Sequence, residues 1–264
     1  VVASSAVDAL GNQHYNGNGG GGAIMITRKH GAINIGGTST KKQTFTNCES
    51  LNNGGAIAFE GGTNPSTEIQ SCNIQYVEID GCKARDGGSA ICMSTATIVN
   101  MSIKDSVIKN CSYVSGYTGT EANKNSLYDE FYTPDMPYGD VPFRTNDSHG
   151  TIRTNGATKA QLVVEGVTFT NNTSVTGGGG IYWNANRLAG YPADTDGTYT
   201  FTNSLAIKNC TFEDNYAFRD GGAIYVEASL TVEGGTFKNN SAQRGGAIAQ
   251  QIYNNSGRPI QSGE

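Results

Sequence analysis

Few side chains in this 264-residue sequence have the types and spacing that catalysis or metal binding needs. The histidines, His14, His30 and His149, lack the spacing of a zinc site, and no nucleophile elbow or phosphate-binding loop is present. Paired carboxylates for glycoside hydrolysis, or oxygen ligands for calcium, have four candidates: Asp129, Glu130, Asp135 and Asp140. The segment that contains these four residues lacks the EF-hand pattern of a calcium site. We predict no catalytic residue, no metal site and no cofactor.

Aromatic side chains gather in two segments, at about 113–149 and 183–203. Aromatic rings offer sugar or protein ligands a large apolar contact, and tyrosine adds a hydroxyl group. The residues that we predict to contact a ligand are Tyr128, Phe131, Tyr132, Tyr138, Trp183 and Tyr191. The other interpretation is that these rings pin long loops onto the rest of the protein, and the sequence leaves both interpretations open.

Charge and hydropathy exclude two classes of partner. The net charge is -5 at pH 7 and no basic cluster is present. Both facts argue against binding to nucleic acid or to an anionic membrane surface. No apolar run approaches the roughly 18 residues that a membrane-spanning helix requires, so we expect no transmembrane segment in this chain.

Glycine accounts for 36 of the 264 residues, about twice its usual share of roughly 7%, and much of the excess is periodic. Gly-Gly-Ala-Ile or a close variant recurs along the chain. The isoleucines that mark these copies are Ile24, Ile57, Ile91, Ile152, Ile181, Ile224 and Ile248. The residues around them alternate with period two, which indicates strands rather than a helical repeat.

A second motif runs in phase with the first. Its strong copies carry Phe-x-x-Asn, at Phe169 and Asn172, Phe212 and Asn215, and Phe237 and Asn240. Its weaker copies place Phe45, Ile79 and Ile108 before Cys48, Cys82 and Cys111. A preceding turn position is occupied by Asp105, Gly166, Asn209 or Gly234. In stacked coils, the Asn and Cys positions would form a ladder along which amide side chains bond.

Two motifs held in fixed phase predict an all-β fold, a single-stranded parallel β-helix of about seven coils. Alternation places Ile224 and Val226 on one face of a strand and Tyr225 on the other. We expect one domain over residues 1–264, with insertions at about 113–149 and 183–203. In solenoids such insertions map to loops and often to the binding face.

The end of the sequence supports one further expectation. No amphipathic helix follows Ala249 to cover the last coil, and an uncovered coil leaves an open sheet edge. We therefore expect a segment of a larger protein, with further repeats or a capping domain at its C-terminal end.

Six cysteines would ordinarily predict three disulfides in a secreted protein. Cys48, Cys82 and Cys111, however, occupy the Asn position in three consecutive copies of the second motif. Equivalent positions of neighbouring coils lie about 4.8 Å apart, inside the Cα window of a disulfide, but three residues in a row cannot all pair. Cys72 and Cys210 have the spacing of small inward residues. We favour mostly buried free thiols over disulfides.

The paired motifs resemble the repeat of the chlamydial polymorphic outer membrane proteins. The resemblance is carried by the three Phe-x-x-Asn copies and by the Gly-Gly-Ala-Ile copies. It implies a right-handed β-helix that is displayed outside the cell and used in adhesion to host surfaces. The expected location is therefore extracellular, at the cell surface or secreted.

Two functional hypotheses follow. The first is an adhesin or structural repeat protein, whose loops bind a cell-surface protein or glycan. The alternative is a secreted carbohydrate-active enzyme, a polysaccharide lyase or glycoside hydrolase on a similar β-helix. Arg85 with Asp86 and Arg219 with Asp220 would suit a lyase, but their recurrence before Gly-Gly favours a solvated turn. We consider an enzyme the less favoured of the two.

Overall fold

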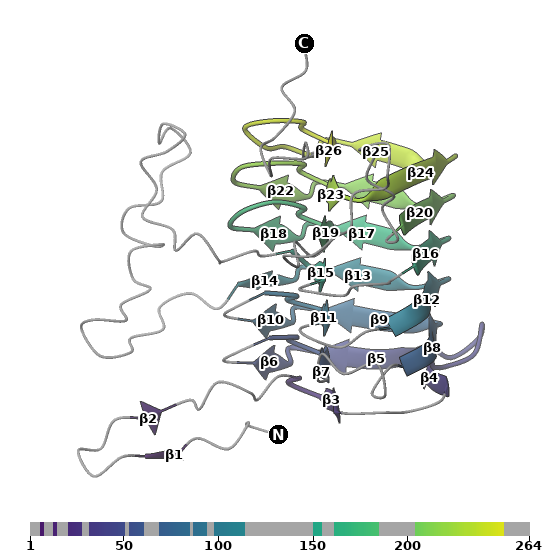
Figure 1. Ribbon diagram of the computed structural model, residues 1–264, viewed down its shortest axis with the longest axis vertical. Coiled ribbons are helices and arrows are strands. Elements are labelled where there is room, and N and C mark those ends of the chain that lie inside the picture. The colour runs from purple at the N-terminus through teal and green to yellow at the C-terminus, as the bar shows by residue number, and fades with distance from the viewer. Residues whose placement is uncertain are drawn as a thin grey trace, which may run out of the picture.

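The computed structural model describes residues 6–7, 13–14, 21–27, 32–50, 53–60, 69–84, 87–93, 98–113, 150–154, 161–184 and 204–250. Every regular element in these ranges is a β-strand. Nearly all of the strands pair in parallel and stack along one axis (Figure 1). The exception is a short antiparallel pair, β1 (Ala6–Val7) with β2 (Gln13–His14). The predicted all-β parallel β-helix is confirmed.

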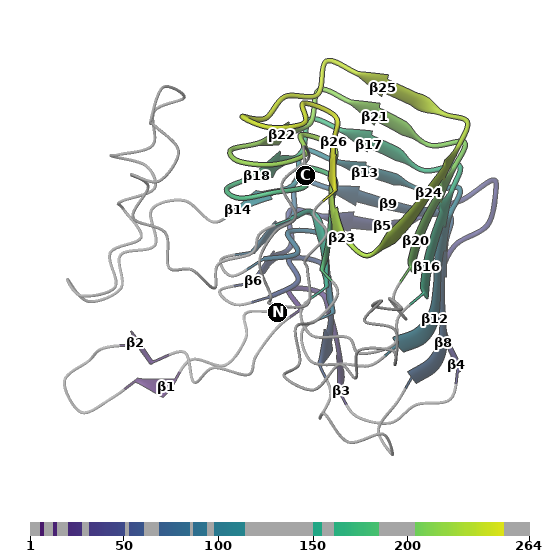
Figure 2. The same ribbon diagram turned by 45° about the horizontal axis from the view of Figure 1, so that its top comes forward.

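Three long sheets form the sides of the solenoid. Sheet I contains β3 (Ile24–Thr27), β7 (Ile57–Glu60), β11 (Ile91–Met93), β15 (Ile152–Thr154), β19 (Ile181–Asn184), β23 (Ile224–Glu227) and β26 (Ile248–Gln250). Sheet II contains β4 (Ala32–Gly36), β8 (Ile69–Gln75), β12 (Ile98–Lys104), β16 (Gln161–Glu165), β20 (Ser204–Lys208) and β24 (Ser229–Glu233). Sheet III contains β5 (Gln43–Thr46), β9 (Val77–Asp80), β13 (Val107–Lys109), β17 (Thr168–Thr170), β21 (Thr211–Glu213) and β25 (Thr236–Lys238). Figure 2 shows the three sheets as separate sides around the core.

Short strands continue the coils beyond sheet III. One small sheet consists of β6 (Glu49–Ser50), β10 (Lys83–Ala84) and β14 (Ser112–Tyr113), and the other pairs β18 (Thr173–Ser174) with β22 (Tyr216–Ala217). Each coil therefore runs from sheet II through sheet III and a short strand to sheet I.

The core follows from the in-register stacking of like residues. The seven isoleucines of the glycine motif pair directly across sheet I, the degenerate copy at Ile152 included. In sheet III, Phe169, Phe212 and Phe237 stack with ring centroids 4.6 and 5.0 Å apart and nearly parallel planes. Aliphatic residues of sheet II close the third side, so one continuous apolar core fills the solenoid.

The two glycines of a doublet are required for different reasons, the first by backbone conformation and the second by lack of space. The first glycine of the doublet in β23's coil, Gly221, has φ of 62°, a left-handed conformation that side chains disfavour. The second, Gly222, lies so close to the next coil that a Cβ atom would come within 2.1 Å of the Gly246 carbonyl oxygen. The turn before sheet III has its own left-handed residues, and the four predicted turn residues are among them: Asp105, Gly166, Asn209 and Gly234.

The predicted Asn ladder is present and buried. The Asn215 Oδ1 atom accepts hydrogen bonds from the backbone N and the Nδ2 of Asn172, at 3.2 and 2.9 Å. Its Nδ2 donates to the Phe169 carbonyl at 3.0 Å and to Asn240 Oδ1 at 2.9 Å. One side chain thus joins three successive coils at a turn where the backbone leaves sheet III.

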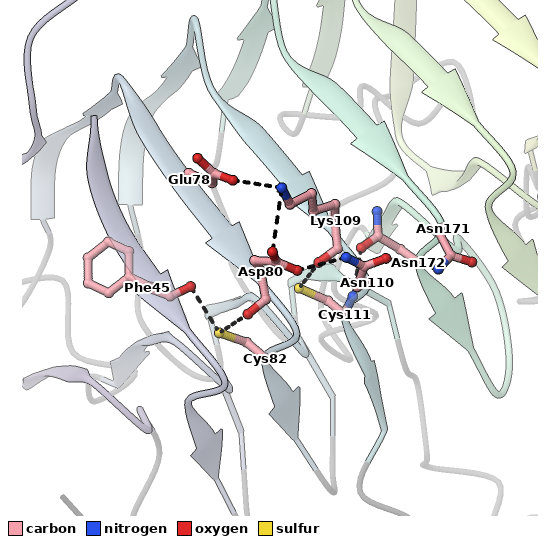
Figure 3. Close-up of polar contacts among 9 residues, drawn as sticks. All are labelled: Phe45, Glu78, Asp80, Cys82, Lys109, Asn110, Cys111, Asn171 and Asn172. Atoms are coloured by element: carbon pink, nitrogen blue, oxygen red, sulfur yellow. Dashed lines mark hydrogen bonds and ion pairs between the residues drawn. The ribbon is translucent and has the colours of Figure 1, made fainter. Parts of the chain in front are cut away.

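Cysteine continues this ladder toward the N-terminus, but it replaces only some of the hydrogen bonds that asparagine makes. The backbone N of Cys111 donates to Asn172 Oδ1 at 3.0 Å, which completes the last amide rung (Figure 3). Below it, the Cys82 thiol donates to the Phe45 carbonyl at 3.6 Å, in the place of an amide Nδ2. A thiol sulfur is a much weaker acceptor than an amide oxygen, so the cysteine rungs are the weaker part of the ladder. All six cysteines are free, as predicted.

We expect Asn215→Ala to lower the free energy of unfolding by about 3 kcal/mol, because it removes four side-chain hydrogen bonds and leaves buried partners unsatisfied. Urea denaturation followed by circular dichroism measures the change. Thr236→Ala, at an exposed position of the next coil, is the control and should change stability by less than about 0.5 kcal/mol. Equal effects of the two substitutions would contradict the ladder.

Candidate interaction surface

The connections beside sheet I vary most in length. From β8 onward, strands of sheet II pass to sheet III with one or two residues between them, as from Gln75 to Val77 and from Glu165 to Thr168, whereas β4 ends at Gly36 and β5 begins at Gln43. After sheet I, a single residue separates the end of β23 at Glu227 from the next strand. In contrast, β19 ends at Asn184 and β20 begins only at Ser204. The other long insertion, after Tyr113, ends just before β15. Because β15 and β19 are paired neighbours, both insertions join the solenoid at adjacent strands of sheet I.

The outward face of sheet I is buried at these strands. The residue after each isoleucine points away from the core, and these residues pair across the sheet in register. Five of them are at most 9% exposed: Ala58, Cys92, Arg153, Tyr182 and Tyr225. The outward positions of sheets II and III are half-buried or exposed over the same coils. Sheet I is therefore the covered side of the solenoid.

Charge pairs between coils occupy the solvent-facing sides instead. Lys104 Nζ lies 2.8 Å from Glu165 on sheet II, and Lys109 Nζ lies 2.7 Å from Glu78 on sheet III. These side chains are one third or more exposed, so solvent screens both pairs and each contributes little to stability. They make these two faces hydrophilic and add little to the fold.

Arg153 crosses the covered face over more than one coil. Its Nη1 donates to Asn53 Oδ1 at 3.1 Å, although the two residues are 100 positions apart in the sequence. The Arg153 side chain is 4% exposed. A guanidinium group at this depth is stable only with hydrogen-bonding partners, so it ties the coil of β15 to an earlier coil on the outside of sheet I.

Tyr182, Tyr225 and Glu227 form the next part of this face. The two tyrosine rings stack with centroids 4.9 Å apart. The Tyr225 hydroxyl donates to Glu227 Oε1 at 2.6 Å, and Glu227 is only 5% exposed. We call Arg153, Tyr182, Tyr225 and Glu227 the outer strip. It combines a cation, a carboxylate and stacked rings where the two insertions meet the solenoid.

Of the six residues predicted to contact a ligand, only Trp183 lies within the described residues. Trp183 pairs with Val226, has no exposed surface and belongs to the core cluster. Its indole packs inside the solenoid, so its position gives no support to the ligand contact predicted for it. The other five lie outside the described residues, and their role stays a prediction: Tyr128, Phe131, Tyr132, Tyr138 and Tyr191. The outer strip was not predicted, although the position after each isoleucine, which changes from Ala and Cys to Arg and Tyr beside the insertions, is a signal for it.

The acidic candidates give no assembled site in the described part of the chain. Asp129, Glu130, Asp135 and Asp140 lie outside the described residues, as do Arg85 and Asp86. Within the described ranges no group of three or more His, Cys, Asp or Glu side chains is placed to hold a metal ion. Asp220 pairs instead with Arg244 of the next coil, with Nε to Oδ1 at 2.5 Å and Nη2 to Oδ2 at 2.9 Å. This contact favours the turn role for Asp220.

The fold and this surface define a parallel β-solenoid repeat protein with one long connection before β15 and another after β19. The family model of the Chlamydia polymorphic membrane protein repeat matches residues 166–182 and 209–227. Each match extends from the turn before sheet III, through Phe-x-x-Asn, into sheet I. The resemblance drawn from the motifs is therefore confirmed, and it indicates a surface protein at a coarse level. No curated protein and no solved structure matched the chain.

In the parts of the chain that the structure describes, no helix has the length and apolar character to cross a bilayer.

A double-mutant cycle tests the outer strip. We expect Tyr225→Phe to lower the free energy of unfolding by about 1–3 kcal/mol, because it removes a donor from a buried carboxylate. Tyr225→Phe, Glu227→Gln and the double variant, compared by urea denaturation, should show a coupling energy above about 0.5 kcal/mol. Additive effects would show that the hydroxyl and the carboxylate do not interact.

Proposed function

We propose that this protein is a non-catalytic surface adhesin or structural repeat protein, whose β-helix presents the insertions at about 113–149 and 183–203 to a ligand outside the cell. The observation that carries the proposal is the attachment of both insertions to adjacent strands, β15 and β19, beside the outer strip. The repeat match supports a surface role. A rigid, regular scaffold with length variation at one side is the arrangement by which solenoids carry binding loops.

The ligand that suits these insertions is a protein or glycan of a host or neighbouring cell surface. The two segments are rich in tyrosine and also contain phenylalanine and tryptophan, and such rings contact sugar faces and apolar protein patches. The net charge of -5 disfavours polyanionic ligands. Cell-surface display or secretion would place the insertions where such ligands occur.

A binding screen on a glycan array and on host cells tests the proposal. The full chain should bind, and a variant with Tyr128, Phe131, Tyr132 and Tyr138 all changed to serine should lose at least tenfold in affinity. Conservative Thr211→Ser and Thr236→Ser changes on sheet III are the matched control. Circular dichroism of every variant verifies the β-helix. Equal binding by the serine variant, or no binding by the full chain, would contradict the loop-mediated function.

The last described coil suggests a second partner. Its strands β24, β25 and β26 are more exposed than their counterparts β20, β21 and β23. Val232 is 40% exposed, while Leu230, Phe237 and Ile248 are only partly buried. This end of the stack presents an apolar surface bordered by the edges of three sheets, which favours further association.

The ladder specifies what fits on this end. In the two preceding rungs, the backbone N of Asn172 and of Asn215 donates to the Oδ1 of an asparagine in the following coil. Asn240 presents the same donor, and Phe237 presents a ring face like those already stacked. We propose that a further Phe-x-x-Asn coil covers this end. Residues 251–264 contain no such motif, so the coil would come from elsewhere.

Extension of the chain tests the fit. A second copy of residues 227–250 is joined after Gln250, and the control carries leucine in place of the added asparagine that follows Phe-x-x. We expect hydrogen exchange of the Asn240 amide to slow at least tenfold with the asparagine coil and less with the leucine coil. Unchanged exchange in both proteins, or equal slowing, would contradict selection of an Asn-bearing coil.

A further inference from the structure

Three cysteines occupy successive rungs of one ladder. Glu49, Lys83 and Ser112 pair in register in the small sheet of β6, β10 and β14, and each directly follows a cysteine. Cys48, Cys82 and Cys111 therefore lie above one another in three neighbouring coils. We call them the cysteine column. The spacing of parallel strands, about 4.8 Å, falls within the Cα separation of disulfides, about 4.4–6.8 Å.

The thiols of the column all lie where the chain passes from sheet III to a short strand. Each donates to a carbonyl in or below its own coil: Cys48 to Thr46 at 3.7 Å, Cys82 to Phe45 at 3.6 Å and Cys111 to Lys109 at 3.3 Å. Figure 3 shows Cys82 and Cys111 on adjacent coils, each beside the turn that leaves sheet III. Cys72 lies in β8 of sheet II, and Cys210 lies between β20 and β21, so neither belongs to the column.

Cys82, at the centre of the column, is the member whose pKa is lowered. A hydrogen bond from the Cys111 thiol, and weaker ones from Cys48, lower the pKa of Cys82 although burial opposes this. The negative charge of Asp80 also opposes it, but that carboxylate is paired with Lys109 at 3.4 Å. Burial raises the pKa of Cys48, and the Cys82 side chain raises that of Cys111. Burial raises the pKa of Cys72 to about 12, which makes it unreactive.

The two ends of the column differ in their exposure to solvent. Cys82 and Cys111 have no exposed surface, whereas Cys48 is only partly buried. An oxidant in solution therefore reaches Cys48 first. The only member of the column next to Cys48 is Cys82.

We propose that the column forms a single disulfide, between Cys48 and Cys82, when the protein meets a small-molecule disulfide oxidant, and that Cys111 stays reduced. The Cys48 thiolate attacks one sulfur of the oxidant, and the first thiolate of the oxidant leaves. The Cys82 thiolate then attacks the Cys48 sulfur of this mixed disulfide, and the second oxidant thiolate leaves. Two cysteine thiols lose two electrons and two protons, and the oxidant becomes two thiols.

The bridge joins the coils where the ladder is weakest. The described residues show no amide oxygen that accepts from the backbone N of Cys48 or Cys82, in contrast to Cys111, which donates to Asn172. A covalent link between the coils of β5 and β9 replaces that missing contact. Oxidation would thus reinforce the N-terminal half of the solenoid without a change in the sheets.

Peptide mapping of the full chain tests the proposal. The folded protein is incubated with oxidised glutathione, free thiols are alkylated in denaturant, and disulfide-linked peptides are identified by mass spectrometry. We expect a Cys48–Cys82 link, with Cys72, Cys92, Cys111 and Cys210 alkylated. Cys48→Ser should lower the yield of disulfide-linked peptide at least tenfold. Cys111→Ser and the distant control Cys210→Ser should retain the Cys48–Cys82 link. Circular dichroism establishes that each variant is folded.

Three results would overturn the proposal. These are no bridge in the folded wild-type protein, a Cys82–Cys111 bridge, and glutathione retained on Cys48 as a mixed disulfide. A Cys82–Cys111 bridge in folded Cys48→Ser would likewise show that the oxidant does not need to enter through Cys48.

Discussion

Every coil of this solenoid must place its side chains directly over those of its neighbours, at the spacing of parallel strands, about 4.8 Å. This constraint accounts for the composition. Isoleucine stacks on isoleucine in sheet I, and phenylalanine rings stack nearly parallel in sheet III. Asparagine bonds to asparagine at the turn. Glycine fills the positions where the next coil leaves no room for a Cβ atom or where the backbone is left-handed.

The same constraint separates architecture from function. Positions that stack have little freedom to vary, since a polar or oversized side chain would disturb both neighbouring coils. Variation is concentrated outside the shared core, in the connections beside sheet I and at the outward positions of its strands. There Arg153 and Glu227 are buried with polar partners rather than in the core. The cysteine column is an intermediate case, because it keeps the stack but gives up the amide hydrogen bonds that asparagine supplies.

The sequence predicted the parts of the fold that stacking controls. The isoleucine register, the phenylalanine column and the left-handed turn residues were all predictable from spacing, because each recurs at a fixed place in successive coils. Trp183 lies on the inward face, as alternation from Ile181 requires, so its position gives no support to the ligand contact predicted for it. The outer strip could not be predicted in the same way. Outward residues of a strand are exposed unless another part of the chain covers them, and no local pattern encodes that cover.

The central claim is the in-register stack, and distances between spin labels test it most directly. Labels introduced through a non-natural amino acid at Thr44 and Thr236, five coils apart in sheet III, should be about 24 Å apart. When the second label is moved to Thr211, one coil nearer, the distance should shorten by about 4.8 Å. Pulsed electron paramagnetic resonance measures both separations. A stacked solenoid predicts narrow distributions with this decrement, and equal or broadly distributed distances would contradict it.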